Sequence, residues 1–192
     1  MPLSHTSKYS ELTDAQYAAL GKAVVEWANV EFLLGVLLSR LLSTPEFLSR
    51  TYTDSISAVR LQDAILEAVE IHRVRYSHRL LSEQILLEIV QVNLQVTAIR
   101  GMRNKIAHFC WARSHDEELF GTSFRGGVPS AKKERRDHAV LTSKELSKLN
   151  GEARSLVEQL MKLVARLPEV SEKSLLALPS SGLPAAAEHV ER

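Results

Sequence analysis

The sequence predicts an all-α protein, an up-and-down bundle of four to five helices with a short irregular β-hairpin or loop inserted before the last helix. Apolar residues recur at spacings of three and four along four stretches of the chain, which is the periodicity of helices that bury one face. Residues that favour helix starts stand directly before three of these stretches. Glycines gather instead between residues 112 and 141, where the helical periodicity breaks.

Composition indicates one domain with terminal extensions. A chain of 192 residues with 45% hydrophobic content can build a single core. We expect an N-terminal extension over residues 1–11, a helical domain over 12–167, and a disordered tail over 168–192, a stretch rich in Ser, Pro and Ala. The net charge of +1 provides no global attraction to nucleic acid or to an anionic membrane, so any RNA binding must come from a local patch.

The N-terminus lacks the basic and then apolar order of a secretory signal, and the most apolar run, residues 32–38, is too short to span a bilayer. The single cysteine, Cys110, excludes an intrachain disulfide and a cysteine-rich zinc site. We therefore expect a cytoplasmic protein with no membrane partner. No cofactor is expected, and no metal either, because no carboxylate or thiolate completes a ligand set around His108 and His115.

The first predicted helix begins at Thr13, which forms a capping box with Gln16, and ends near Pro45. Its apolar face comprises Leu20, Val24, Trp27, Leu34, Leu38 and Leu41.

Two further helices follow. Caps at residues 53–55 open the second, whose apolar face comprises Ala58, Leu61, Ile65, Ala68 and Val69 and which stops in the basic stretch 72–79. The third runs over residues 80–111, with apolar residues every seven positions at Ile85, Val92, Ile99 and Ile106 and flanking residues Ile89, Val96 and Cys110. Gly101 is the position at which we expect this long helix to be weakest.

The insertion at residues 112–141 contains two strand-like pieces, 118–124 and 138–141, around a basic tip. The candidate RNA contacts lie in this tip and are Lys132, Lys133, Arg135 and Arg136. Thr142 and Glu145 form a second capping box, which opens the last helix, and Pro168 ends that helix.

Two charged residues interrupt the apolar faces. Glu31 falls between Trp27 and Leu34, and Arg103 takes the position that Val96 and Ile89 hold one and two heptads earlier. A charge on a packing face is costly unless it is paired. We therefore expect Glu31 to contact Arg103, or its neighbour Lys105, across the interface of these two helices.

His108 lies five residues after Arg103. In an α-helix this separation places the two side chains about 140° apart around the axis and about 7.5 Å apart along it, so direct contact within one chain is awkward. A twofold dimer built on this helix would gather two Arg103 and two His108 around one cleft. Asn104 and Gly101 share the face of His108, and Gly101 would let a second backbone approach.

This segment, R-N-K-I-A-H, together with Trp27-x-x-x-Glu31-x-x-Leu34 and the return to a Thr-capped last helix, resembles the HEPN family of all-α proteins over roughly residues 12–167. Arg103, Asn104 and His108 match the order and spacing of the family motif: an Arg, a polar residue, a few spacers and a His. The resemblance implies a bundle that dimerises through the motif helices. It also implies, for many members, metal-independent endoribonuclease activity in toxin, phage-defence or RNA-processing systems, with an antitoxin or regulatory protein as a further partner.

The residue types suit that chemistry. Histidine titrates near neutral pH and can take the proton of a ribose 2′-hydroxyl, so we assign this role to His108. A forked guanidinium stabilises the charge that develops on the phosphoryl oxygens, a role for Arg103. Asn104, Glu31 and Lys105 would be auxiliary residues.

Simpler interpretations stay open. A histidine and an arginine are also favoured near helix C-termini by the helix dipole, and a basic loop such as 132–136 is usually only solvated. The alternatives to a ribonuclease are a noncatalytic HEPN-like dimer that binds a nucleotide, RNA or a partner protein, and a plain helical scaffold.

Overall fold

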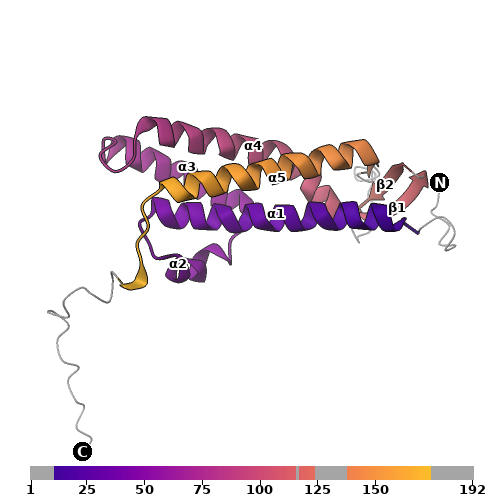
Figure 1. Cartoon of the computed structure of the whole chain (residues 1–192), viewed down its shortest axis with the longest axis horizontal. Coiled ribbons are helices and arrows are strands. Elements are labelled where there is room, and N and C mark those ends of the chain that lie inside the picture. The colour runs from indigo at the N-terminus through magenta and orange to yellow at the C-terminus, as the bar shows by residue number, and fades with distance from the viewer. Residues whose placement is uncertain (1–10, 116, 124–137, 174–192) are drawn as a thin grey trace, which may run out of the picture.

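The computed structural model describes residues 11–115, 117–123 and 138–173. Within these residues the chain forms five helices and a three-stranded antiparallel sheet, and Figure 1 shows the four long helices side by side with the sheet at one end. The prediction of a helical fold with a hairpin insertion is thus confirmed at the level of a mostly helical chain with a small sheet before the last helix. The elements in order are α1 (Asp14–Leu41), α2 (Glu46–Thr53), α3 (Ala58–Val74), α4 (Glu83–His108), β1 (Cys110–His115), β2 (Glu118–Thr122), β3 (His138–Thr142) and α5 (Ser143–Arg166).

Both predicted capping boxes are confirmed. At the start of α1, Thr13 N donates to Gln16 Oε1 at 2.9 Å, and Gln16 N donates to Thr13 Oγ1 at 3.2 Å. At the start of α5, Thr142 N donates to Glu145 Oε2 at 2.8 Å, and Glu145 N donates to Thr142 Oγ1 at 3.2 Å. Each pair of bonds satisfies amide groups that a helix N-terminus otherwise leaves unpaired.

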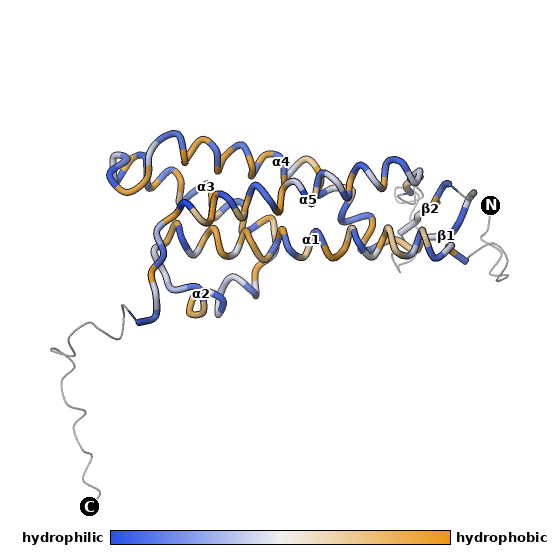
Figure 2. The backbone as a smooth tube through the Cα atoms, in the orientation of Figure 1, coloured by the Kyte–Doolittle hydropathy of each residue, from blue (hydrophilic) through white to orange (hydrophobic). Residues whose placement is uncertain are grey.

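The main core lies where α1 packs along α5, with α3 and α4 completing it. Figure 2 shows hydrophobic residues recurring along α1 and α4, as the periodicity of the sequence predicts. Trp27, Leu34, Leu38 and Leu41 are buried as expected. Val24 is less buried than expected: 49% of it is exposed, at the edge of the face that carries Trp27.

Helix α2 was not predicted. This helix has eight residues, and its N-cap, Pro45, makes no side-chain capping bond. It packs on α1, where the side chain of Ser49 is hydrogen-bonded to that of Ser39. The expected cap at residues 53–55 is also wrong, because α2 ends at Thr53 with Asp54 as its C-cap, and Ser57 is the N-cap of α3.

The rotation of α4 about its axis is fixed by a buried polar network with α3. Gln62 Nε2 donates to Asn93 O at 2.9 Å and to Thr97 Oγ1 at 2.8 Å, and Arg100 Nη1 donates to Gln62 Oε1 at 2.5 Å. Buried polar groups are costly when unpaired, so this network selects the face of α4 that meets α3. The same network therefore determines which residues of α4 face solvent.

The third predicted helix is too long at its C-terminal end. It was expected to reach Trp111, but α4 ends at His108 and Cys110 is an exposed residue of β1. The chain turns because Phe109 is extended and Trp111 Nε1 donates to Ile106 O, one of the last carbonyls of α4, at 3.1 Å. The helix runs without interruption through Gly101, so the expected weakness there produces no break.

The sheet has the order β1-β2-β3 with both pairs antiparallel. The two strands expected in the insertion correspond to β2 and β3, with ends that differ by one or two residues, whereas β1 was not predicted. Gly121 of β2 lies directly beneath Trp111 of β1, and a Cβ atom at Gly121 would lie 2.7 Å from that ring. A second small core of Ala23, Ile106, Leu119, Leu141 and Leu146 joins the sheet to α1, α4 and α5.

By length and composition alone, α4 could cross a membrane, and 33% of its most apolar stretch is buried. A single helix of this kind is weak evidence for a membrane span, because core helices of soluble proteins have the same composition.

Candidate functional site

The expected contact between Glu31 and Arg103 is confirmed. Arg103 Nη2 of α4 donates to Glu31 Oε2 of α1 at 3.1 Å, and 28% of the Arg103 side chain and 33% of the Glu31 side chain are exposed. Of the two residues expected to contact Glu31, Arg103 is the one that makes this bond. The two charges that interrupt the apolar faces therefore neutralise each other at a half-buried position.

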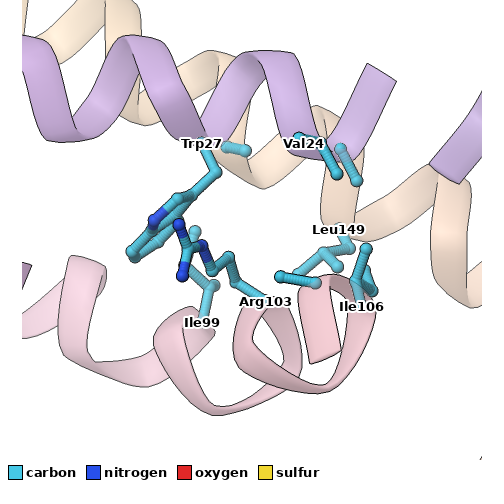
Figure 3. Close-up of a pocket in the computed structure, with 9 residues that line it drawn as sticks. Val24, Trp27, Ile99, Arg103, Ile106 and Leu149 are labelled. Atoms are coloured by element: carbon cyan, nitrogen blue, oxygen red, sulfur yellow. The ribbon is translucent and has the colours of Figure 1, made fainter. Parts of the chain in front are cut away.

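Trp27 is the second residue of α1 that holds Arg103, and the sequence analysis did not identify this role. The Arg103 guanidinium lies over the indole ring, 5.4 Å from the ring centroid. Figure 3 shows the two side chains next to each other. Trp27 and Glu31 are one helical turn apart on α1, a spacing that places both on the same face. That i, i+4 spacing was the available signal, because an aromatic ring and a carboxylate on one face make a suitable cradle for an arginine.

The space beside Arg103 is a small apolar cavity of about 30 Å³. Figure 3 shows Val24, Ile99, Ile106 and Leu149 around it. A cavity of this size has room for about one water molecule. In a single chain it is therefore a packing gap next to the guanidinium and too small for a nucleotide.

The other residues of the motif face outward. Asn104 is exposed, and its Oδ1 accepts a hydrogen bond from Arg103 Nη1 at 3.2 Å. Lys105 Nζ lies 5.8 Å from the ring centroid of Phe109. His108 is the last residue of α4 and is exposed. A single chain thus links Glu31, Arg103 and Asn104 but does not turn His108 toward the cavity beside Arg103.

The outward face of α4 carries a stripe of exposed residues that leads to His108. Leu87 and Leu94 are 48% and 64% exposed, and Gly101 and His108 follow at the same spacing of seven. A Cβ atom built on Gly101 would meet nothing within 4 Å. We name these four residues the α4 stripe, and they leave space at Gly101 for the backbone of another molecule.

The sheet holds the end of α4 that carries the motif. Trp111 donates a hydrogen bond to the Ile106 carbonyl and packs on Gly121. Phe109 lies between Ile106 and Trp111 in the chain, and the centroid of its ring is 6.1 Å from that of the Trp111 ring. His108 is therefore presented from a helix end that is fixed on one side by the sheet.

The candidate RNA contacts Lys132, Lys133, Arg135 and Arg136 lie outside the described residues. Within the part of the chain that the structure describes, no three His, Cys, Asp or Glu side chains are grouped as a metal site would require.

Comparisons of this chain with protein families, with curated proteins and with solved structures found no match.

Proposed function

We propose that this chain is a HEPN-like, metal-independent endoribonuclease that acts as a homodimer. The observation that carries the proposal is the placement of Arg103, which Glu31 and Trp27 hold half-buried at the same helix end that presents Asn104 and His108 to solvent. In this arrangement the cation is oriented before substrate binds, while the residue suited to proton transfer stays accessible. The order and spacing of these residues resemble the HEPN motif, which supports the same proposal.

Cleavage would follow from in-line attack of the ribose 2′-oxygen. His108 takes the proton of the 2′-hydroxyl, and the 2′-oxygen forms a bond to phosphorus while the bond from phosphorus to the 5′-oxygen breaks. A water molecule gives a proton to the departing 5′-oxygen, so each site needs one His108 and one Arg103. Arg103 stabilises the charge on the nonbridging oxygens, and the products are a 2′,3′-cyclic phosphate and a 5′-hydroxyl.

A dimer supplies what one chain lacks. Arg103 and His108 point to different sides of α4, so a complete site needs a second copy of this helix beside the first. The α4 stripe provides a surface for it, with exposed Leu87 and Leu94 and an open position at Gly101. The bundle, of four to five helices arranged up and down, would then pair through α4.

A noncatalytic dimer that binds a nucleotide, RNA or a partner protein is the second candidate, and one observation favours it. Arg103 already bonds to Glu31 and Asn104 and stacks on Trp27 within its own chain. These are contacts that a purely structural arginine also makes.

An RNA cleavage assay with EDTA and analysis of the product ends tests the proposal. Wild-type protein should leave 2′,3′-cyclic phosphate ends without added metal, and both His108→Ala and Arg103→Ala should lower the rate by at least about 100-fold, the range for a general base or a charge-stabilising group. His78→Ala is the matched control because His78 is an exposed histidine in the turn between α3 and α4. An inactive wild-type protein that is still dimeric would contradict the ribonuclease and favour the noncatalytic dimer.

Mixing two inactive variants tests whether the site is shared. If each site takes Arg103 from one subunit and His108 from the other, a heterodimer of Arg103→Ala with His108→Ala contains one complete site. Unfolding and refolding the two variants together should then restore about a quarter of the wild-type rate, given random pairing and symmetric closure. No recovery, with heterodimers demonstrated by mass spectrometry, would show that each site belongs to one chain.

Gly101→Arg tests the dimer surface. Because no atom lies within 4 Å of the added Cβ, the change should leave the monomer folded and make the protein monomeric in light scattering. Gly21→Arg on α1 is the control, since Gly21 is equally open. A Gly101→Arg protein that stays dimeric would exclude this surface.

A further inference from the structure

A second hollow lies between α1, α2 and α5, away from Arg103. It is an open groove of about 300 Å³, which is the lower end of the range for small-molecule sites. Phe32 and Val36 of α1 form one wall, and Met161 and Val164 of α5 form the other. Phe32 and Met161 are 46% and 57% exposed, so apolar surface is open to a ligand.

Arg40 stands at the polar end of this groove, and only 12% of its side chain is exposed. Arg40 Nη2 lies 3.0 Å from Glu169 Oε2. Arg40 Nε, on the same edge of the guanidinium, is buried and has no hydrogen-bond partner among the described residues. A buried N–H without a partner is costly, so this edge of Arg40 is only half satisfied.

Elsewhere in this chain an arginine makes both hydrogen bonds to one carboxylate. Arg73 donates from Nε to Glu83 Oε2 at 3.2 Å and from Nη2 to Glu83 Oε1 at 2.8 Å. This paired geometry is the strong form of carboxylate recognition by arginine. Arg40 presents the same two nitrogens, but only Nη2 has a carboxylate oxygen beside it, in the ion pair with Glu169.

The Glu169 carboxylate can be displaced from Arg40 by a ligand. Glu169 follows Pro168 in the segment after α5, and 65% of its side chain is exposed, so its carboxylate can move into water at little cost. The other carboxylate of the groove, Glu46, is neutralised by Arg50 at 3.2 Å. Departure of Glu169 therefore leaves one unbalanced positive charge at the end of an apolar groove.

We propose that this groove binds a small monocarboxylate with an apolar body, whose carboxylate replaces Glu169 and bonds to both Nε and Nη2 of Arg40. The apolar body lies between Phe32 and Met161. The site is independent of the proposed ribonuclease, because it shares no residue with the cavity around Arg103.

Decanoate, below its micelle concentration, is the probe, and decanol and acetate are the matched probes that lack the charge or the apolar body. Titration calorimetry of the full chain should show binding of decanoate at least about 10-fold tighter than of either, because both the charged bond and the apolar contact contribute. The methionine methyl resonances locate the site. The Met161 methyl, at the groove, should shift, and that of Met102, which packs against the second core cluster, should not.

Three variants test the roles of the residues. Arg40→Met should weaken decanoate binding by about 10-fold or more, Glu169→Gln should strengthen it because a competing carboxylate is gone, and Met161→Glu should weaken it. Arg154→Met is the control, an exposed arginine of α5 that is paired with Glu158 at 3.6 Å. Since Arg40→Met could disturb folding, Glu169→Gln is decisive: unchanged or weaker binding in a folded Glu169→Gln protein overturns the proposal. Equal binding of decanoate and decanol, or a shift at Met102 alone, also overturns it.

Discussion

Replacing Glu31 by Gln should lower the free energy of unfolding by about 1.5 kcal/mol. The two charges are 3.1 Å apart, and each side chain is roughly two-thirds buried. At this distance the gross attraction is about 1.3 kcal/mol in water and about 5 kcal/mol at an effective dielectric constant near 20. Desolvation removes most of the larger figure, so the net value lies between those of exposed and buried pairs, at about 1.5 kcal/mol.

Arg103→Met should cost more, about 2.5 kcal/mol, because it also removes the contact with Trp27, for which about 1 kcal/mol is expected. Once Arg103 is replaced, the further change Glu31→Gln should cost almost nothing, because the ion pair is already lost. The double variant should therefore be about as stable as Arg103→Met, which is a coupling of about 1.5 kcal/mol between the two changes. Urea unfolding followed by far-UV circular dichroism measures all four proteins. Fluorescence is unsuitable, because Trp27 itself contacts Arg103.

The exposed pair Arg154 and Glu158 is the control, and its coupling should be no more than about 0.5 kcal/mol. The coupling of Glu31 with Arg103 should also survive high salt better than that of the control pair, because buried charges are screened less. Additive effects of Glu31→Gln and Arg103→Met, within about 0.3 kcal/mol, would refute the reasoning.

Three further predictions concern the sheet and the last helix. Thr142→Ala should lower the free energy of unfolding by about 1 kcal/mol through loss of the bond from Glu145 N to Thr142 Oγ1, measured by urea unfolding. In the other direction, the backbone N–H of Thr142 and then its hydroxyl donate to the Glu145 carboxylate and lower the pKa of Glu145. The pKa of Glu145 in the folded protein lies below that in the unfolded chain, so the stability that Glu145 contributes is present above pH 4.5 and is lost as the pH falls through the folded-state pKa. The difference in free energy of unfolding between wild-type protein and Glu145→Gln should therefore shrink on acidification. A difference that grows would contradict this. Gly121→Ala should destabilise by about 1–3 kcal/mol because its Cβ would lie 2.7 Å from the ring of Trp111. The control is Gly151→Ala, in an open helical position, which should stabilise the protein by about 0.5–1 kcal/mol. Thermal melts measure both variants, and equal effects of the two changes would exclude the close contact as the cause.

The features that sequence reasoning predicted correctly are those with local causes. The two capping boxes depend on residues three positions apart, Thr13 with Gln16 and Thr142 with Glu145, and such pairs form wherever the helix forms. The contact of Glu31 with Arg103 is long-range, but each charge interrupts an apolar face, and the need of each for a partner made the pairing predictable.

The features that were missed have causes outside their own sequence. Helix α2 is short and lacks a side-chain cap, so packing on α1 stabilises it more than its own residues do. Cys110 continues the apolar spacing of α4, yet β1 forms because β2 pairs with it and Trp111 turns back onto Ile106. The groove at Arg40 could not be predicted either, because its second wall and Glu169 come from the distant end of the chain.

The site residues show the same division. The spacing of Arg103 and His108 correctly indicated that one helix turns them to different sides. Whether a second chain lies opposite His108 depends on the α4 stripe of another molecule, which no pattern within one sequence determines.

The packing of α1 along α5 has a consequence for synthesis of the protein. The first helix finds its main partner in the last one, and about a hundred residues separate the end of α1 from the start of α5. At ordinary translation rates the ribosome needs roughly 5–20 s to make that intervening chain. During this time Trp27, Leu34 and Leu38 of the nascent chain lack their final cover. We therefore expect the nascent protein to depend on chaperones, and a chain that stops before α5 to aggregate instead of folding.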